Sequence, residues 1–257
     1  MRYFLTTLYG RSEILFLFGA VCLLAALVFI TLTRYSDTQV MGVNAWYKPF
    51  KFALSIGIFC WTMGWYTGYL DGGPGLRTYA WAMVILLGFE LVYIALQAGR
   101  GQLSHFNDSS PAYAGLYAAM AVAATAVALW TAYIGLLFFR EDFPGLPDHY
   151  VWGIRTGIVI FVVFALEGFV MGSRMSHTIG GPDGGPGLPV VNWSTRYGDP
   201  RIAHFIGMHA LQVLPILSWF LLKDTKAVLL AAMLYGLLAV FTLVQALQGR
   251  AIFSGQS

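Results

Sequence analysis

The chain has 257 residues, of which 58% are hydrophobic and 11% charged, and its formal net charge is +3. A soluble domain has about 25% charged and about 45–50% apolar residues, so much of this chain has to contact lipid. The composition excludes a soluble globular enzyme, a nucleic-acid-binding module and a disordered tail.

Seven apolar stretches are long enough to cross the membrane, since a spanning helix needs about 20 apolar residues. Their apolar runs are continuous and do not alternate as the strands of a membrane β-barrel do. The sequence therefore predicts an all-α, polytopic integral membrane protein in which residues 1–257 form one domain of seven transmembrane helices. The predicted spans are residues 13–33, 49–69, 80–97, 113–139, 151–172, 202–222 and 227–247.

The predicted loops differ between the two membrane faces. Face A carries the N-terminus and loops 70–79, 140–150 and 223–226, and face B carries loops 34–48, 99–112 and 173–201 with the C-terminus. Basic residues number seven on face A and eight on face B, so their distribution favours neither orientation. Face B also holds the long Gly/Pro-rich segment 178–200, between the fifth and sixth predicted helices. Long ordered loops are often lids or ligand-binding loops.

Two short sequences occur twice. DGGPGL stands at residues 71–76 and again at 183–188. Three crossings separate the copies, as in an inverted repeat, although glycine and proline are also ordinary turn residues. ALQAGR (95–100) and ALQGR (246–250) close the third and seventh predicted spans. Arginine at a helix C-terminus interacts favourably with the helix dipole and with lipid phosphates, which accounts for the second pair.

Four of the five histidines lie on face B or enter the membrane from it, and His149 alone belongs to face A. His105 and His177 end extensions of the third and fifth spans, and His204 lies in the first turn of the sixth. Three imidazoles are a common ligand set for a catalytic metal, and imidazole suits Zn, Cu or Fe. We therefore predict a metal site at His105, His177 and His204. The alternative is that these histidines bind loop backbone or lipid headgroups.

A few ionisable side chains lie within the predicted spans, where such groups cost about 2.5–3.5 kcal/mol and usually serve a function. Glu90, Glu167 and His209 are the candidate catalytic or proton-relay residues, and we expect Glu167 to contact His209 across neighbouring helices. His209 shares a helix face with Gln212, three residues on. His204, His209 and Gln212 are the candidate cofactor ligands, including the axial ligands of a single b-type haem. The alternative is a protonated glutamate that only bonds helices together.

The segments NAWYKPFKFALS, QAGRGQLSHFN and DGGPGLPVVNWSTRYGDPRIAHFIGMHALQVLP together resemble a group of bacterial multi-pass membrane proteins of unassigned function. The resemblance runs from the second predicted span to the sixth. It implies an integral protein of the bacterial inner membrane, and it transfers no activity, cofactor or catalytic residue.

Three functions fit these features. The first is a redox or hydrolytic protein with a His-rich site for Zn, Cu, Fe or haem b that opens on face B. Its partners would be the lipid bilayer and a small hydrophobic or quinone-like ligand, not nucleic acid. The second is a proton-coupled small-molecule transporter or ligand sensor that uses Glu90, Glu167 and His209 as a polar core. The third is a structural subunit of a membrane complex. The sequence leaves open whether the protein is an enzyme and what its oligomeric state is.

Overall fold

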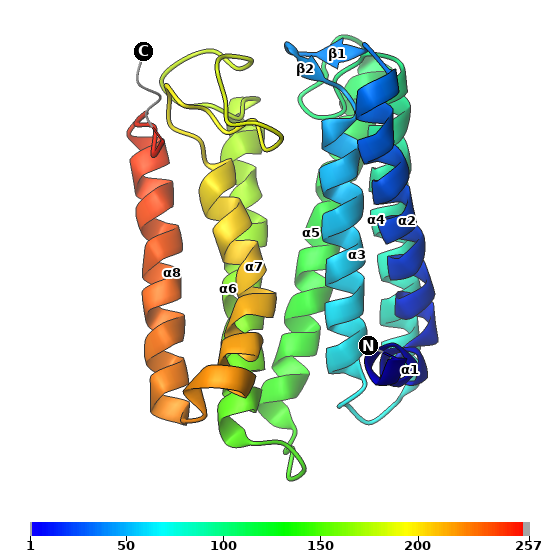
Figure 1. Ribbon diagram of the computed structural model, residues 1–257, viewed down its shortest axis with the longest axis vertical. Coiled ribbons are helices and arrows are strands. Elements are labelled where there is room, and N and C mark those ends of the chain that lie inside the picture. The colour runs from blue at the N-terminus through cyan, green and yellow to red at the C-terminus, as the bar shows by residue number, and fades with distance from the viewer. Residues whose placement is uncertain (1, 254–257) are drawn as a thin grey trace. The chain divides into compact units, whose positions relative to one another are not determined.

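A computed structural model of the protein describes residues 2–253, and these residues form an all-α structure (Figure 1). A short antiparallel pair of strands joins the second and third helices, and a π-helical turn extends the seventh. The elements are α1 (Arg2–Arg11), α2 (Glu13–Tyr35), β1 (Gln39–Val40), β2 (Val43–Asn44), α3 (Tyr47–Thr67), α4 (Pro74–Gly99), α5 (Pro111–Arg140), α6 (Asp148–Arg174), α7 (Arg201–Leu217), η1 (Ser218–Leu222) and α8 (Thr225–Leu247).

Six helices of the described chain are long and apolar enough to cross a membrane: α2, α4, α5, α6, α7 with η1, and α8. The protein is thus a multi-pass helical membrane protein. The second predicted span corresponds to α3, which has 21 residues but is less apolar than the other six. Lys48 and Lys51 lie in its first turns, and tryptophan, threonine and tyrosine fill its last turns. A seventh crossing by α3 stays a prediction.

The chain divides into two compact units, residues 1–127 and 128–257, and the division falls within α5. Unit 1 contains α1 to α4 and the first half of α5. Unit 2 contains the second half of α5 and α6 to α8.

In unit 1, α2 and α3 pack closely because glycines face each other. A Cβ added to Gly57 would lie 3.1 Å from the carbonyl oxygen of Gly19, and one added to Gly19 would lie 3.2 Å from that of Gly57. Small residues of this kind let two membrane helices approach backbone to backbone. α4 contacts both members of the pair.

In unit 2, α6 and α7 form the corresponding close pair. A Cβ on Gly157 of α6 would lie 2.8 Å from the carbonyl oxygen of Ala210, and one on Gly207 of α7 would collide with the ring of Phe164. α8 contacts both helices. The phenol of Tyr235 on α8 donates a hydrogen bond to the carbonyl of Ile206 on α7, at 2.6 Å.

The first helix of each close pair ends in the same way. Residues 34–38 (RYSDT) contain the last residues of α2 and the start of the loop after it, and residues 174–178 (RMSHT) contain the end of α6 and the start of its loop. In each copy the backbone N–H of the threonine is bonded to the serine hydroxyl two residues earlier, at 3.3 Å in the first and 3.1 Å in the second. The two segments thus share their Arg, Ser and Thr and a local hydrogen bond.

The second helix of each pair also begins alike. Residues 47–57 (YKPFKFALSIG) and 197–207 (YGDPRIAHFIG) share tyrosine, a basic residue, alanine and a final Ile-Gly at the same spacing. The final glycine of each segment makes the close helix contact described above.

The third helix of each unit ends in a third shared feature. The amide nitrogen of Gln97 on α4 donates to the carbonyl of Leu103, and that of Gln245 on α8 donates to the carbonyl of Ala251, both at 3.1 Å. In each copy the glycine four residues after the glutamine adopts a positive φ, +66° in the first and +74° in the second, which favours glycine at a helix C-terminus. The shared letters ALQ would pair Gln97 with Gln248. The hydrogen bonds and the glycine positions instead make Gln97 equivalent to Gln245.

These features indicate that α2–α4 and α6–α8 are two copies of one three-helix plan, joined by α5. The first DGGPGL segment runs from the loop after α3 into the first turn of α4, and the second lies in the loop after α6. These places are not equivalent in the three-helix plan, so the segments do not mark the repeat. If α2 to α5 each cross the membrane, the two copies have the same orientation, as in transporters with parallel repeats.

This arrangement predicts which loops share a membrane face. In a variant whose buried Cys22 and Cys60 are replaced by alanine, cysteines at exposed Gln39 and Gly185 should react with an impermeant maleimide from the same side.

Two further cysteines complete the topology test. Asp142→Cys and Asp71→Cys, both at exposed positions, should react only from the opposite side. Reaction of positions 39 and 185 from opposite sides would refute the parallel repeat, and reaction of positions 39 and 71 from one side would show that α3 does not cross.

Candidate functional site

An ion-pair contact between a carboxylate and an imidazole lies between α6 and α7 in unit 2. Glu167 lies seven residues before the end of α6, and His204 lies in the first turn of α7. Nδ1 of His204 is 3.4 Å from Oε2 of Glu167, and the two side chains are 29% and 5% exposed, respectively. The imidazole packs beside Gly168, next to Glu167, where an added Cβ would lie 3.4 Å from Cε1 of His204, in ordinary van der Waals contact.

The polar atoms of this pair lack hydrogen bonds. Both carboxylate oxygens of Glu167 and Nδ1 of His204 are buried and without a hydrogen-bond partner among the described residues. Their separation of 3.4 Å exceeds the length of a good N–H···O bond, about 2.7–3.2 Å. Buried polar groups are nearly always hydrogen-bonded, and an exception indicates a functional role or a missing partner.

The structure pairs Glu167 with His204 and not with His209, the predicted partner. The reason is the rotation of α7. Gly207 faces Phe164 of α6, and His204 lies three residues before Gly207, on the same side of the helix. His209 lies two residues after Gly207 and therefore points about 200° away.

His209 has other neighbours. Its Nδ1 lies 3.4 Å from Oε1 of Gln212, which agrees with the predicted shared face. Its ring centroid is 4.3 Å from that of Phe205, which in turn is 5.3 Å from that of Trp193 in the loop between α6 and α7. His209 is thus linked to that loop by aromatic contacts.

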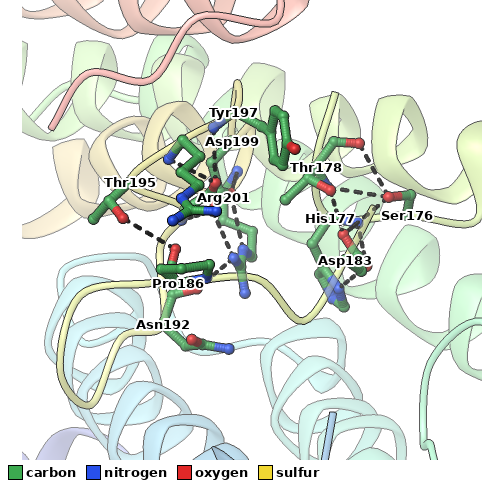
Figure 2. A network of polar contacts seen from close by, with 12 residues as sticks. Ser176, His177, Thr178, Asp183, Pro186, Asn192, Thr195, Tyr197, Asp199 and Arg201 are labelled. Carbon is green, nitrogen blue, oxygen red and sulfur yellow. Dashed lines mark hydrogen bonds and ion pairs between the residues drawn. The ribbon is translucent and has the colours of Figure 1, made fainter. Parts of the chain in front are cut away.

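The loop itself, residues 175–200, contains two polar clusters (Figure 2). In the first, the backbone N–H of His177 donates to Oδ2 of Asp183 at 2.8 Å, and Nδ1 of the same histidine lies 3.0 Å from that oxygen. The hydroxyls of Ser176 and Thr178 lie 2.9 and 2.7 Å from Oδ1. Burial opposes ionisation of Asp183, but the bonds from His177 and Thr178 outweigh it and hold the pKa of the carboxyl well below its usual range.

The second cluster fixes the loop to the start of α7. Asp199 is buried; its carboxylate accepts hydrogen bonds from the Arg201 guanidinium and, at 2.8 Å, from the backbone N–H of Ser194. Arg201 also donates to the carbonyl oxygen of Asn192 at 2.6 Å. The cluster therefore holds both the loop and the first turn of α7, which carries His204.

The predicted metal ligands are divided between the two units. His105 belongs to unit 1, where its Nδ1 lies 3.2 Å from the Ser104 hydroxyl and its ring contacts Phe52. In unit 2, His177 contacts Asp183 and His204 contacts Glu167. Residues 2–253 contain no group of three or more His, Cys, Asp or Glu side chains that could hold a metal ion. The metal and haem sites stay predictions.

Glu90, the other predicted carboxylate, belongs to unit 1. It is buried on α4, and its Oε1 has no hydrogen-bond partner among the described residues. Tyr93 and Gln97, on the same helix, also have a buried polar oxygen without a partner. Sequence reasoning missed both, because a tyrosine and a glutamine near a helix end are ordinary interfacial residues.

Comparison of the chain with known protein families, curated proteins and solved structures finds no match. The function therefore has to be argued from the Glu167–His204 pair and its surroundings.

The Asp183 cluster predicts a pH dependence of loop order. Because the pKa of Asp183 is lowered in the folded protein, its bonds stabilise the loop above the pKa of an unfolded aspartate, about 3.9. This stabilisation is lost as the pH falls below that value. The protection of residues 176–187 against amide hydrogen exchange, relative to an unstructured chain at the same pH, should therefore be high at neutral pH and fall in acid.

The Asp183→Asn variant tests the cause. It should exchange rapidly already at neutral pH and lose the acid-dependent step, because an amide accepts these bonds less strongly than a carboxylate. Asp142→Asn, an exposed acid in unit 2, is the control and should behave as the unmodified protein. An unchanged acid step in Asp183→Asn would assign it to another group.

Proposed function

We propose that this protein is a proton-coupled small-molecule transporter of the bacterial inner membrane, and that Glu167 and His204 exchange the coupling proton. The observation that carries the proposal is the buried carboxylate–imidazole contact at 3.4 Å, in which three polar atoms have no hydrogen bond among the described residues. Ionisable groups within a membrane protein commonly form proton relays.

The chemistry of the pair suits proton coupling. A carboxylate beside an imidazolium and a carboxylic acid beside a neutral imidazole both have zero net charge. One extra proton gives the pair a charge of +1, and loss of one gives −1; either is costly in an apolar interior. Proton binding therefore favours a compensating change, such as entry of water or movement of a helix.

The surroundings of the pair provide an element that could move. His204 lies in the first turn of α7, and the preceding loop is fixed to that turn through Asp199 and Arg201. A shift of the imidazole would therefore act on a loop of 26 residues, numbers 175–200. The repeated three-helix plan adds support, since many transporters contain internal repeats.

The other functions considered from the sequence have less support. A redox or hydrolytic metal site needs more ligands than the pair supplies, and residues 2–253 contain no larger cluster. Elemental analysis and an absorption spectrum of the purified protein test this directly. Stoichiometric Zn, Cu or Fe, or a Soret band, would favour the metal or haem hypothesis over transport.

Infrared difference spectra test the proton exchange at Glu167 without knowledge of the substrate. On transfer from H2O to D2O, the protein in nanodiscs should show a shifted carbonyl band from a carboxylic acid whose proton exchanges. Glu167→Gln should remove this band, and His204→Gln should change the rate at which it shifts. A spectrum that Glu167→Gln leaves unchanged would contradict the proposal.

Transport is tested in proteoliposomes that contain a pH-sensitive dye, with a panel of small amines, amino acids and organic acids outside. Glu167→Gln should abolish substrate-driven proton flux, because an amide side chain does not bind and release the coupling proton. His204→Leu introduces the residue that the repeat has at the equivalent position, Leu54, and should fold but lose flux. Asp142→Asn should retain it.

A further inference from the structure

Unit 1 contains a row of buried polar side chains on α4, whereas the Glu167–His204 pair belongs to unit 2. Glu90, Tyr93 and Gln97 lie at positions i, i+3 and i+7 of α4, and thus on one face of the helix. They are 7%, 7% and 1% exposed. Tyr93 also packs with Ile94 and Met120 in a small apolar cluster.

The unsatisfied atoms of this row are all oxygens. Oε1 of Glu90, the hydroxyl of Tyr93 and Oε1 of Gln97 are buried and have no hydrogen-bond partner within residues 2–253. The amide nitrogen of Gln97 already donates to the carbonyl of Leu103, which fixes the amide so that its oxygen remains unbonded. An unmet buried polar group costs about 1–3 kcal/mol, so three of them in one row favour a bound donor.

The charge of the row and its unbonded oxygens both favour a positively charged hydrogen-bond donor. Glu90 takes part in none of the ion pairs His177–Asp183, Arg201–Asp199 and His204–Glu167. A carboxylate oxygen and an amide oxygen accept hydrogen bonds, and a phenol accepts as well as donates. A cation with N–H donors supplies hydrogen bonds to oxygens of all three kinds.

Unit 2 has no such row at the equivalent positions. With Gln97 equivalent to Gln245, the positions of Glu90 and Tyr93 correspond to Leu238 and Phe241 of α8. Those two side chains are 50% and 62% exposed, so unit 2 presents an exposed apolar face where unit 1 buries polar groups. The buried polar row is thus particular to unit 1.

We propose that Glu90, Tyr93 and Gln97 bind a small primary ammonium ion. Its N–H donors bind acceptor oxygens of this kind, and its positive charge offsets that of Glu90. The aromatic rings nearby, Phe52 against the Tyr93 cluster and Phe52 against His105, suit a cation as well. The proposal rests on the proposed function only in naming its substrate class, since the binding site lies in the other unit.

Methylammonium is the probe, and its binding to the full chain in nanodiscs is measured by calorimetry and by scintillation proximity. We expect saturable binding of methylammonium, and none of tetramethylammonium or methanol, which lack the N–H donors or the charge. Glu90→Gln should weaken binding about tenfold or more, and Tyr93→Phe about threefold to tenfold. Asp71→Asn, an exposed acid of unit 1, should bind as the unmodified protein.

Glu90→Leu, which introduces the unit 2 residue, keeps the test valid if the glutamine variant does not fold. It should abolish binding. Equal binding of tetramethylammonium, absence of saturable binding, or binding that survives both Glu90 variants would overturn the proposal.

The two proposals fail separately. Glu167→Gln should bind methylammonium and lose proton-coupled flux. If methylammonium does not bind but Glu167 still exchanges its proton, the ammonium site is wrong and proton coupling stands. If methylammonium binds and no carboxyl band depends on Glu167, proton coupling at Glu167 is wrong and the ammonium site stands.

Discussion

The close approach of paired helices at glycine is the constraint on which the rest of each unit depends. Without a hydrophobic driving force inside a bilayer, helices associate by packing and hydrogen bonds, and small residues bring the backbones together. Gly19 and Gly57 do this for α2 and α3, and Gly157 and Gly207 do it for α6 and α7. A glycine contact also fixes the rotation of each helix, so it decides which side chains meet its neighbour.

That rotation explains which part of the site could be predicted. Hydropathy was sufficient to locate the helices, and the cost of burying charge identified Glu167 and Glu90 as unusual. The partner of Glu167 could not be predicted by depth alone, which favoured His209. The contact between Gly207 and Phe164 of α6 sets the rotation of α7 and so turns His204 toward α6. The sequence does not show that these two residues meet.

Local hydrogen bonds account for other differences between sequence and structure. The segment 178–200 suggested an ordered loop by its Gly and Pro content, but not the bonds that order it. Asp183 bonds to residues five to seven positions before it, and Arg201 bonds to Asn192 nine positions before it. Side chains that satisfy nearby backbone and hydroxyl groups leave no periodic pattern. The hydrogen bonds of Gln97 and Gln245 to carbonyls six residues later also leave no pattern in the sequence. The repeated letters ALQ therefore pointed to Gln248 as the equivalent of Gln97.

The repeat separates what the fold requires from what is added to it. Both units form a close helix pair, a serine–threonine turn and a glutamine-stabilised helix end. Their buried carboxylates are not equivalent, because Glu90 lies on the third helix of its unit and Glu167 on the first. Each costs about 2.5–3.5 kcal/mol in a membrane, a large share of a total stability of about 5–15 kcal/mol. Such a cost is best explained by function.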